Sequence, residues 1–352
     1  MSEPNSHAHL WPGVPLALGS AALFGAAPPL CKLLLDSVNP FMLAGLLYLG
    51  AGIGLALYRL ARGTGAGEAQ LTARDMPWLA LAIGAGGIVA PVLLMFGLSL
   101  NTASSSALLL NLEGLATMAI AWLVYRENVD RRLLLGAFAI LAGAVLLSWQ
   151  GEGVAFNLGA VLVAGACLAW GLDNNFTRRI SATDPVVIAM LKGLVAGVVN
   201  VGLALAAGAS FPPASIVAIT AAVGFFGIGV SLVMFIVALR HLGTARTGAY
   251  YSLAPFIGAL LAIAVLGDAV TLKLAIAGLL MGFGLWLHLS ERHEHEHDHE
   301  ELEHEHSHVH DEHHQHHHDG PVTEPHSHWH RHAPMRHRHP HYPDLHHRHG
   351  HS

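Results

Sequence analysis

Apolar runs of about twenty residues, separated by short polar stretches, follow one another from residue 14 to residue 289. A bilayer core about 30 Å thick needs about twenty consecutive apolar residues in each helix that crosses it. Helices are required because lipid offers backbone amides and carbonyls no hydrogen-bond partner. The pattern predicts an all-α integral membrane fold with ten spanning helices, at Val14–Leu35, Phe41–Leu57, Trp78–Leu98, Ser104–Tyr125, Leu133–Trp149, Leu158–Phe176, Val186–Ala207, Ile216–Leu239, Thr247–Leu266 and Leu272–Leu289.

The number of long uncharged runs excludes a very apolar soluble helical protein, and the composition agrees with a membrane protein. Hydrophobic residues make up 53% of the chain and charged residues only 12%. The net charge of −6 comes from residues 291–352, which hold 13 acidic and 5 basic side chains, whereas residues 1–290 hold 11 acidic and 13 basic ones. The body is therefore slightly basic, and the acidic balance belongs to the C-terminal tail.

Histidine dominates this tail. Residues 291–352 hold 24 of the 28 histidines, the other four being His7, His9, His241 and His288. Imidazole prefers zinc, nickel and copper to magnesium or calcium, and the carboxylates between the histidines can complete a coordination shell. We expect that no cofactor is required and that the tail binds a divalent transition metal. The histidines expected to act as ligands are His293, His295, His297, His299, His304, His306, His308, His310, His313, His314, His316, His317 and His318.

The tail lacks the apolar residues that a core needs, so the sequence predicts disorder in the absence of metal. Its purpose stays open between collecting ions for export, sensing metal, buffering it and sensing pH. The predicted organisation is a cytoplasmic N-terminus (1–13), a first five-helix repeat (14–149), a linker (150–157), a second repeat (158–290) and the tail (291–352).

Arginines occupy alternate loops. Basic residues near membrane spans are concentrated on the cytoplasmic side. The chain is therefore predicted to be a multi-pass protein of the cytoplasmic (inner) membrane with both termini in the cytoplasm. The arginines concerned are Arg59, Arg62, Arg74, Arg126, Arg131, Arg132, Arg178, Arg179, Arg240 and Arg246.

The two halves of the body share a sequence pattern. The segment LNTASSSALLLNLEG (100–114) corresponds to LGTARTGAYYSLAPF (242–256). Further matches in the same order are Phe24-Gly25 with Trp170-Gly171, Pro40 with Pro185, and Glu127 with Asp268. Five spans in each copy is an odd number, so the second copy enters the membrane inverted. Inverted repeats are typical of secondary transporters, which bind substrate between the copies.

The body resembles EamA-type members of the drug/metabolite transporter superfamily. The resemblance covers residues 14–289 and is most specific in YRENVDRRLLLGAFAILAGAVLL (125–147) and LGDAVTLKLAIAGLLMGFGLWL (266–287). In each segment an acidic residue follows one helix and a glycine-punctuated helix closes the repeat. The resemblance implies ten helices in two inverted repeats around a central cavity, and export or exchange of small solutes. The histidine tail is not part of the family core.

Charged side chains inside predicted spans are expensive and face a partner or a cavity. Asp173 and Lys192 are expected at similar depth on adjacent helices, and we hypothesise an ion pair between them, either structural or involved in gating. Glu113, with Asn111 close by, has no basic residue three or four positions away. It is a candidate for proton coupling or cation contact; the alternative is a structural carboxyl group hydrogen-bonded across a helix interface.

Prolines mark possible breaks in the helices. Pro28-Pro29 is expected to interrupt the first span, where the aligned residues of the sixth are Asn174-Asn175. Pro255 aligns with Glu113 and follows Tyr250 and Tyr251, which are expected to line the site. Unwound backbone in a membrane is tolerated against protein or a water-filled cavity, so these positions predict the level of a solute pathway.

The sequence favours a secondary transporter, and in particular an exporter of a divalent transition metal such as nickel, cobalt or zinc. The alternative is an exporter of amino acids or other small metabolites with a regulatory tail. A membrane-anchored metal sensor or buffer is a third hypothesis. We expect no enzyme, since the sequence shows no nucleophile–base pair, phosphate loop or closed metal motif. The expected partners are the lipid bilayer, a small solute or metal ion, and a possible second copy in a homodimer, but no nucleic acid.

Overall fold

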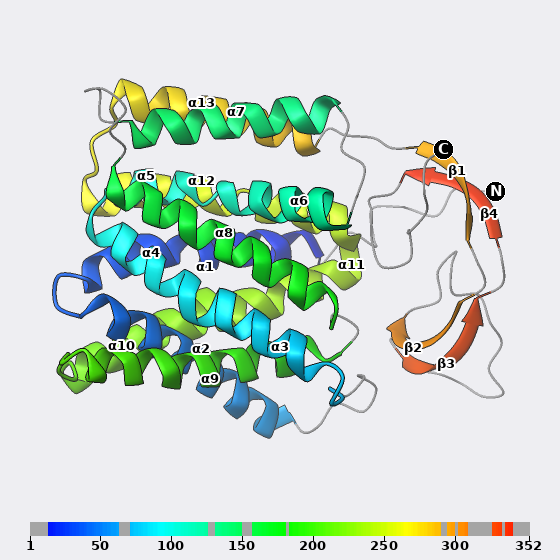
Figure 1. The fold of residues 1–352 in the computed structure, drawn as a ribbon, viewed down its shortest axis with the longest axis horizontal. Coiled ribbons are helices and arrows are strands. Elements are labelled where there is room, and N and C mark those ends of the chain that lie inside the picture. Colours follow the sequence, from blue (N-terminus) through cyan, green and yellow to red (C-terminus); the bar gives the residue numbers. More distant parts are fainter. Residues whose placement is uncertain are drawn as a thin grey trace.

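A computed structural model describes residues 13–62, 71–125, 131–149, 157–180 and 183–289, together with four strands of the tail. The helices lie side by side along a common direction, horizontal in Figure 1. Their bounds are α1 (Gly13–Leu34), α2 (Pro40–Arg62), α3 (Met76–Ala82), η1 (Ile83–Val89), α4 (Ala90–Ser99), α5 (Ala103–Leu109), α6 (Leu112–Tyr125), α7 (Arg131–Ser148), α8 (Leu158–Arg178), α9 (Pro185–Ala206), α10 (Ala214–Gly224), η2 (Phe225–Val230), α11 (Ser231–Tyr251), α12 (Ala254–Leu261), η3 (Ala262–Leu266) and α13 (Leu272–Leu289). The elements written η are π-helical.

Eight helical segments in the described part of the chain are long and apolar enough to cross a membrane. They are Gly13–Leu34, Pro40–Ala61, Met76–Ser99, Ala103–Val124, Arg131–Ser148, Pro185–Ala206, Ala214–Ala238 and Leu272–Leu289. The shorter apolar helix Ala254–Leu266 and the 21-residue helix α8 correspond to the two remaining predicted spans. The chain is a multi-pass membrane protein.

Helix α11 extends across the stretch where the sequence predicts a loop between two spans. The ring centroids of Phe235 and Tyr251 are nevertheless only 4.8 Å apart. Sixteen residues of straight helix would separate them by about 24 Å. The chain therefore reverses direction within α11, as two separate spans require.

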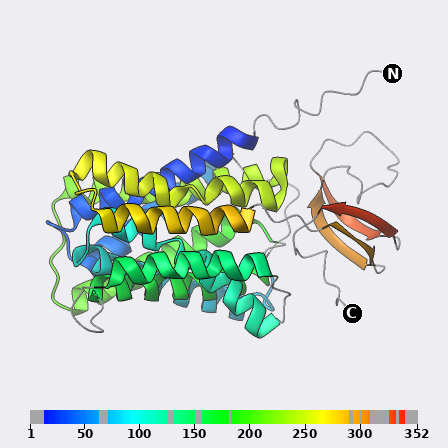
Figure 2. The same cartoon turned by 90° about the horizontal axis from the view of Figure 1, so that it is seen from above.

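Arginines gather at one end of the helix bundle. Arg59, at the end of α2, forms an ion pair of 2.6 Å with Asp184, just before α9. The guanidinium of Arg179, after α8, lies 5.2 Å from the ring centroid of Trp78 in α3. At the opposite end the Lys32 ammonium donates to the carbonyl of Leu98, 2.5 Å away. The arginine end is the one beside the tail strands in Figures 1 and 2.

Two helix irregularities recur at a fixed spacing. The π-helical turns η1 and η2 begin at Ile83 and Phe225, 142 residues apart. Helix α5 is separated from α6 at Leu110, and α11 from α12 at Ser252, again 142 residues apart. Pro255 lies in the first turn of α12, where a missing amide hydrogen costs nothing. The expected break is therefore present before Pro255.

The expected interruption at Pro28-Pro29 is absent. Helix α1 runs without a break from Gly13 to Leu34 with both prolines inside it, and α8 likewise continues through Asn174-Asn175. Proline removes a helical hydrogen bond, which membrane helices tolerate when neighbouring helices pack against the freed carbonyls. The carbonyl of Gly25 faces α12, since a β-carbon on Gly258 would lie 2.6 Å from its oxygen.

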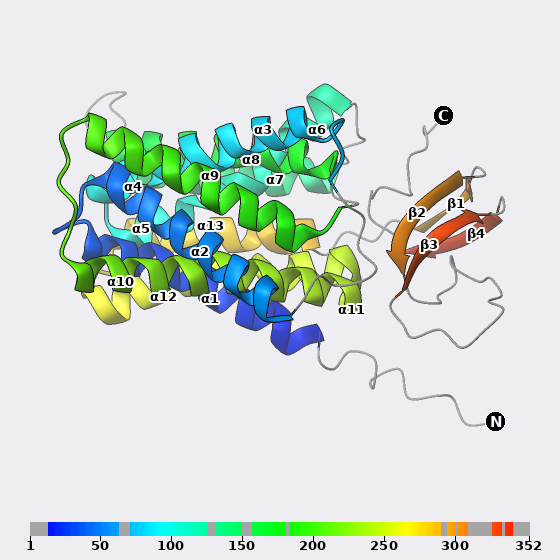
Figure 3. The same ribbon diagram turned by 90° about the horizontal axis from the view of Figure 1, so that it is seen from below.

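The tail contains four strands where the sequence predicts disorder. Strand β1 (Glu294–His299) pairs antiparallel with β4 (Met335–Pro340), and β2 (Leu302–His308) with β3 (His326–His332). In these segments histidine alternates with other residues, and such a period of two suits an extended strand, whose side chains point alternately to opposite faces. This alternation explains why strands are present where disorder was predicted. Figure 3 shows the strands beyond the ends of the helices. Outside the described residues lie 1–12, 150–156, and the predicted metal ligands His293, His310, His313, His314, His316, His317 and His318.

Candidate functional site

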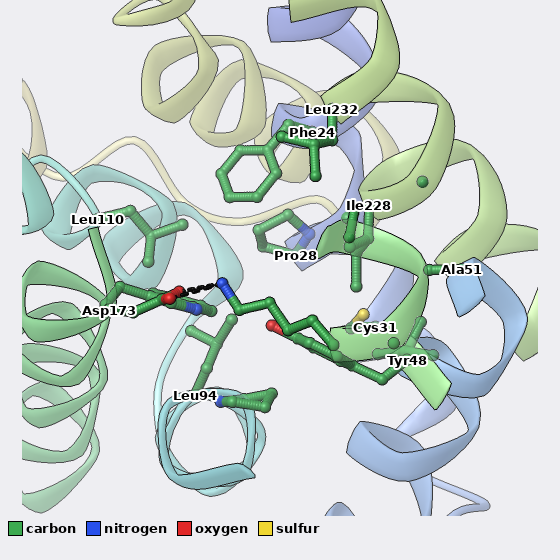
Figure 4. A pocket seen from close by; sticks show the side chains of 18 of the residues that line it. Phe24, Pro28, Cys31, Tyr48, Ala51, Leu94, Leu110, Asp173, Ile228 and Leu232 are labelled. Carbon is green, nitrogen blue, oxygen red and sulfur yellow. Dashed lines mark hydrogen bonds and ion pairs between the residues drawn. The ribbon is translucent and has the colours of Figure 1, made fainter. Parts of the chain in front are cut away.

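A cavity of about 170 Å³ lies in the middle of the helix bundle. Both halves of the body line it: α1, α2, α4 and the α5–α6 break from the first half, and α8, α9, η2 and α11 from the second. Its walls are mostly apolar. Figure 4 shows Asp173 entering from one side and Tyr48 and Cys31 from the other, with Phe24 and Pro28 between them.

The predicted ion pair between Asp173 and Lys192 is present in this cavity. The Lys192 ammonium lies 2.6 Å from Oδ1 and 2.5 Å from Oδ2 of Asp173, so it meets both oxygens of the carboxylate. The Thr177 hydroxyl donates a third hydrogen bond, to Oδ1, at 3.0 Å. Asp173 is only 3% exposed, which makes this pairing necessary for the charge to be tolerated.

Gly86 provides the space for this pair. A β-carbon at position 86 would lie 1.9 Å from Oδ2 of Asp173. The carbonyl of Gly86 accepts hydrogen bonds from the Tyr48 hydroxyl at 2.8 Å and from the Trp170 indole N–H at 3.0 Å. A π-helical turn displaces carbonyls from the regular helical ladder, so Gly86 is available to both donors.

Sequence reasoning missed Gly86, Trp170 and Tyr48 as site residues. The apolar periodicity of the third span gives no sign of a π-helical turn. The one available signal was the match of Trp170-Gly171 with Phe24-Gly25 in the other half, and both Phe24 and Trp170 line the cavity.

Glu113 also lines the cavity, in the first turn of α6. Its Oε1 accepts a hydrogen bond of 3.0 Å from the Asn174 amide, which also donates to the Thr117 hydroxyl at 3.1 Å. Among the residues that the structure describes, no ion pair of Glu113 with a lysine or arginine is present. The helix N-terminus and one amide therefore support this carboxyl group in place of an ion pair.

Aromatic side chains form a second part of the wall. The rings of Phe24 and Tyr251 have centroids 5.5 Å apart, and both line the cavity. Phe235 packs edge-on behind Tyr251 at 4.8 Å. Of the predicted pathway residues, the structure thus brings Pro28, Glu113, Asp173, Lys192 and Tyr251 to one cavity.

The other predicted pathway residues lie outside the lining. The Asn111 amide donates to the carbonyl of Leu108 at 2.8 Å, at the break between α5 and α6. The Asn175 amide donates to the carbonyls of Gly171 and Thr117 and so links α8 to α6. Tyr250 packs against a small apolar cluster near the start of α1, and Asn174 reaches the site only through Glu113.

The cavity offers few metal ligands. Within the described residues, no group of three or more His, Cys, Asp or Glu side chains could hold a metal ion. Both oxygens of Asp173 are engaged by Lys192, which leaves Glu113 and the Cys31 thiol. The predicted tail ligands His295, His297, His299, His304, His306 and His308 lie on strands β1 and β2.

Comparisons with known proteins agree with this architecture. The model of the EamA-like transporter family matches the chain twice, over residues 11–149 and 157–290. An uncharacterized transporter of Methanothermobacter thermautotrophicus is 28% identical over 296 residues, covering 79% of this chain and 86% of that protein. A solved crystal structure superposes with a TM-score of 0.59 at 21% identity, covering 78% of this chain and 95% of that chain, a likeness that concerns the fold alone.

Proposed function

The chain belongs to the EamA-like transporter family, and we propose that its central cavity is the substrate site of a secondary transporter of the cytoplasmic membrane. In this proposal ten spanning helices form two inverted repeats of five. The observation that carries the proposal is the position of the cavity. It lies between the two family-matched halves and gathers Glu113 and the Asp173–Lys192 pair at one level.

Contacts between α2 and α9 support the inverted repeat. A β-carbon on Gly52 would lie 2.5 Å from the backbone nitrogen of Leu194, and one on Gly197 would lie 2.6 Å from the backbone nitrogen of Leu49. The two glycines are 145 residues apart, as are the two leucines, which is also the spacing between the first residues of α2 and α9. Shifting the numbering by one repeat therefore exchanges the two contacts.

Helices α7 and α13 show the same exchange. A β-carbon on Gly143 would lie 2.8 Å from Cγ of Met281, and one on Gly284 would lie 2.8 Å from Cγ1 of Ile140. Both equivalences span 141 residues. In each helix pair the earlier residue of one helix meets the later residue of the other, so equivalent helices run antiparallel. Antiparallel equivalents are what inversion in the membrane requires.

The charges of the cavity are not duplicated. The residues that align with Asp173 and Lys192 in the first half are Ala27 and Leu47, and both line the cavity. We assign Glu113 to contact with the cation or the proton that drives transport. We assign the Asp173–Lys192 pair a role in gating, because this ion pair links α8 to α9 beside the substrate site.

The arginine-rich end of the bundle supports a cytoplasmic location for both termini, because arginine accumulates on that side of a membrane. The tail then lies on the same side as the solute to be exported. For the substrate, an apolar cavity with one uncompensated carboxylate favours a small organic solute. A divalent transition metal is the second candidate, favoured by the histidine content of the tail.

Growth of cells that lack the gene tests this function. A panel of transition metals and of small amines, amino acids and their analogues is applied to the deletion strain. The strain is complemented with the full chain, with Glu113→Gln, or with Cys167→Ala as the matched control. We expect the wild type and the control to restore tolerance of one class of solute and Glu113→Gln not to do so. Full restoration by Glu113→Gln would contradict the assignment of the cavity.

A further inference from the structure

We infer that the cavity takes a small organic monocation, an alkyl- or arylalkylammonium of about the size of benzylamine. This inference rests on the proposed function, since it names the substrate class of the same site. It combines the charge of the lining, the chemistry of the aromatic walls and the size of the cavity.

In its ionised form, Glu113 would leave the lining with one more negative than positive charge. Three charged side chains line the cavity in the part of the chain that the structure describes, namely Glu113, Asp173 and Lys192. Lys192 meets both oxygens of Asp173 within 2.6 Å, so it is not available to a ligand carboxylate. A charged ligand inside a membrane needs a partner of opposite charge. In this cavity, Glu113 can be that partner for a positively charged ligand, and no cation is available for a negatively charged one.

This arrangement disfavours zwitterions and anions. An amino acid would place its ammonium near Glu113 but would leave its carboxylate in an apolar cavity without a cation. Desolvating an unpaired carboxylate costs several kcal/mol. A ligand with an ammonium and no carboxylate avoids this cost.

The aromatic walls suit the apolar part and the positive charge of such a ligand. The polar ends of Tyr48 and Trp170 are both engaged with the carbonyl of Gly86, which leaves their ring surfaces as the groups that they can offer to a ligand. Phe24 and Tyr251 add two further rings that pack on each other. Ring faces attract cations and bury alkyl or aryl groups.

The volume limits the ligand to one ring or a short chain. An apolar protein cavity of about 150 Å³ is large enough to bind benzene. The present cavity, at about 170 Å³, therefore holds a six-membered ring with a short ammonium arm. A divalent metal ion would need several strong ligands, and the carboxylate and thiol groups of the described lining that are outside the Asp173–Lys192 pair are those of Glu113 and Cys31.

Binding to the purified full-length protein in lipid nanodiscs tests the inference. The ligands form a matched series: phenethylamine, phenylalanine, which adds a carboxylate, and phenylacetate, which carries only the carboxylate. We expect phenethylamine to bind and the other two to bind at least about tenfold more weakly, the factor expected from one unpaired buried charge. Phenylalanine binding as tightly as phenethylamine would overturn the inference, and so would displacement of phenethylamine by equimolar nickel.

Variants separate the role of the Glu113 charge from a general loss of folding. Glu113→Gln is expected to weaken phenethylamine binding about tenfold or more, whereas Glu113→Asp, which keeps the charge, and Cys167→Ala are expected to retain most of it. Equal binding by Glu113→Gln would overturn the inference.

Counterflow of labelled phenethylamine in proteoliposomes distinguishes the two proposals. Tight binding without counterflow would contradict the transporter mechanism and leave the ligand class standing. Gene-dependent transport of another solute, with no binding of the amine, would contradict the inferred ligand class but would agree with the proposed transporter function.

Discussion

Gly86 and Asp173 occupy complementary space: a β-carbon on the glycine would lie 1.9 Å from Oδ2 of the carboxylate. The replacement Gly86→Ala should displace Asp173 from Lys192 and lower thermal stability in detergent by about 1–3 kcal/mol, the usual cost of overpacking. Gly84→Ala is the matched control, since a β-carbon at Gly84, in the same π-helical turn, has no neighbour within 4 Å. Equal stability of the two variants would contradict the contact.

The Asp173–Lys192 pair should show strong energetic coupling. Lys192→Met leaves a buried carboxylate without its cation and is expected to cost about 3–5 kcal/mol. Asp173→Asn with Lys192→Met removes both charges and should cost less than the lysine variant alone. A double-mutant cycle of unfolding free energies measures the difference. Costs that simply add, within about 0.5 kcal/mol, would mean that the two residues do not interact.

Cys31 provides a chemical probe of the cavity. Its thiol lines the cavity but is only 2% exposed, so a small methanethiosulfonate reagent should reach it only when the cavity opens. In a Cys167→Ala background, a bound substrate cation is expected to slow modification several-fold, as followed by mass spectrometry. Cys31→Ala in the same background should show no modification. A modification rate that no transported solute changes would argue against the cavity as the binding site.

The proposed orientation predicts which loops are accessible from outside. In a chain with Cys31 and Cys167 replaced by alanine, Ser210→Cys should react with an impermeant maleimide in intact cells, because it precedes α10 at the arginine-free end. Ala73→Cys, exposed before α3 at the arginine-rich end, should react only after permeabilisation. The reverse pattern would invert the proposed orientation. Labelling of both cysteines from one side of the membrane would contradict the position of the two loops at opposite ends of the helix bundle.

The tail should account for metal binding by the full chain. Removing residues 291–352 takes away 24 of the 28 histidines, so we expect nickel binding measured by equilibrium dialysis to be lost. Binding by the full chain should fall between pH 7 and pH 5, because imidazole must be neutral to bind metal and is protonated near pH 6.5 and below. Metal binding that persists in the shortened chain would place the sites in the body.

The regular succession of apolar runs predicted much of the fold, because a membrane requires each spanning helix to have about the same length and an apolar surface. The same constraint predicted the Asp173–Lys192 pair, since two opposite charges at equal depth in apolar surroundings stabilise each other. Gly86 escaped prediction because the position of a π-helical turn depends on tertiary packing. The expected break at Pro28-Pro29 was wrong because proline removes hydrogen bonds without dictating whether neighbouring helices hold the segment together.

Asn111 illustrates a further limit of reasoning from spacing. It lies two residues before Glu113 and shares its level in the membrane, but its amide is used by the carbonyl of Leu108. A side-chain amide at a helix break can also donate to a nearby backbone carbonyl, and that local partner outcompetes a cavity. Sequence spacing gives the depth of a residue but does not give the direction of its side chain.

The restriction of the ion pair to one of the two proposed repeats, with Ala27 and Leu47 at the equivalent places in the other, has a consequence for the proposed transport cycle. Two inverted copies with identical interactions would make the inward-open and outward-open conformations equal in free energy. An electrostatic attraction carried by one copy removes that degeneracy. The resting population of this protein is therefore expected to favour one conformation even when no gradient is applied.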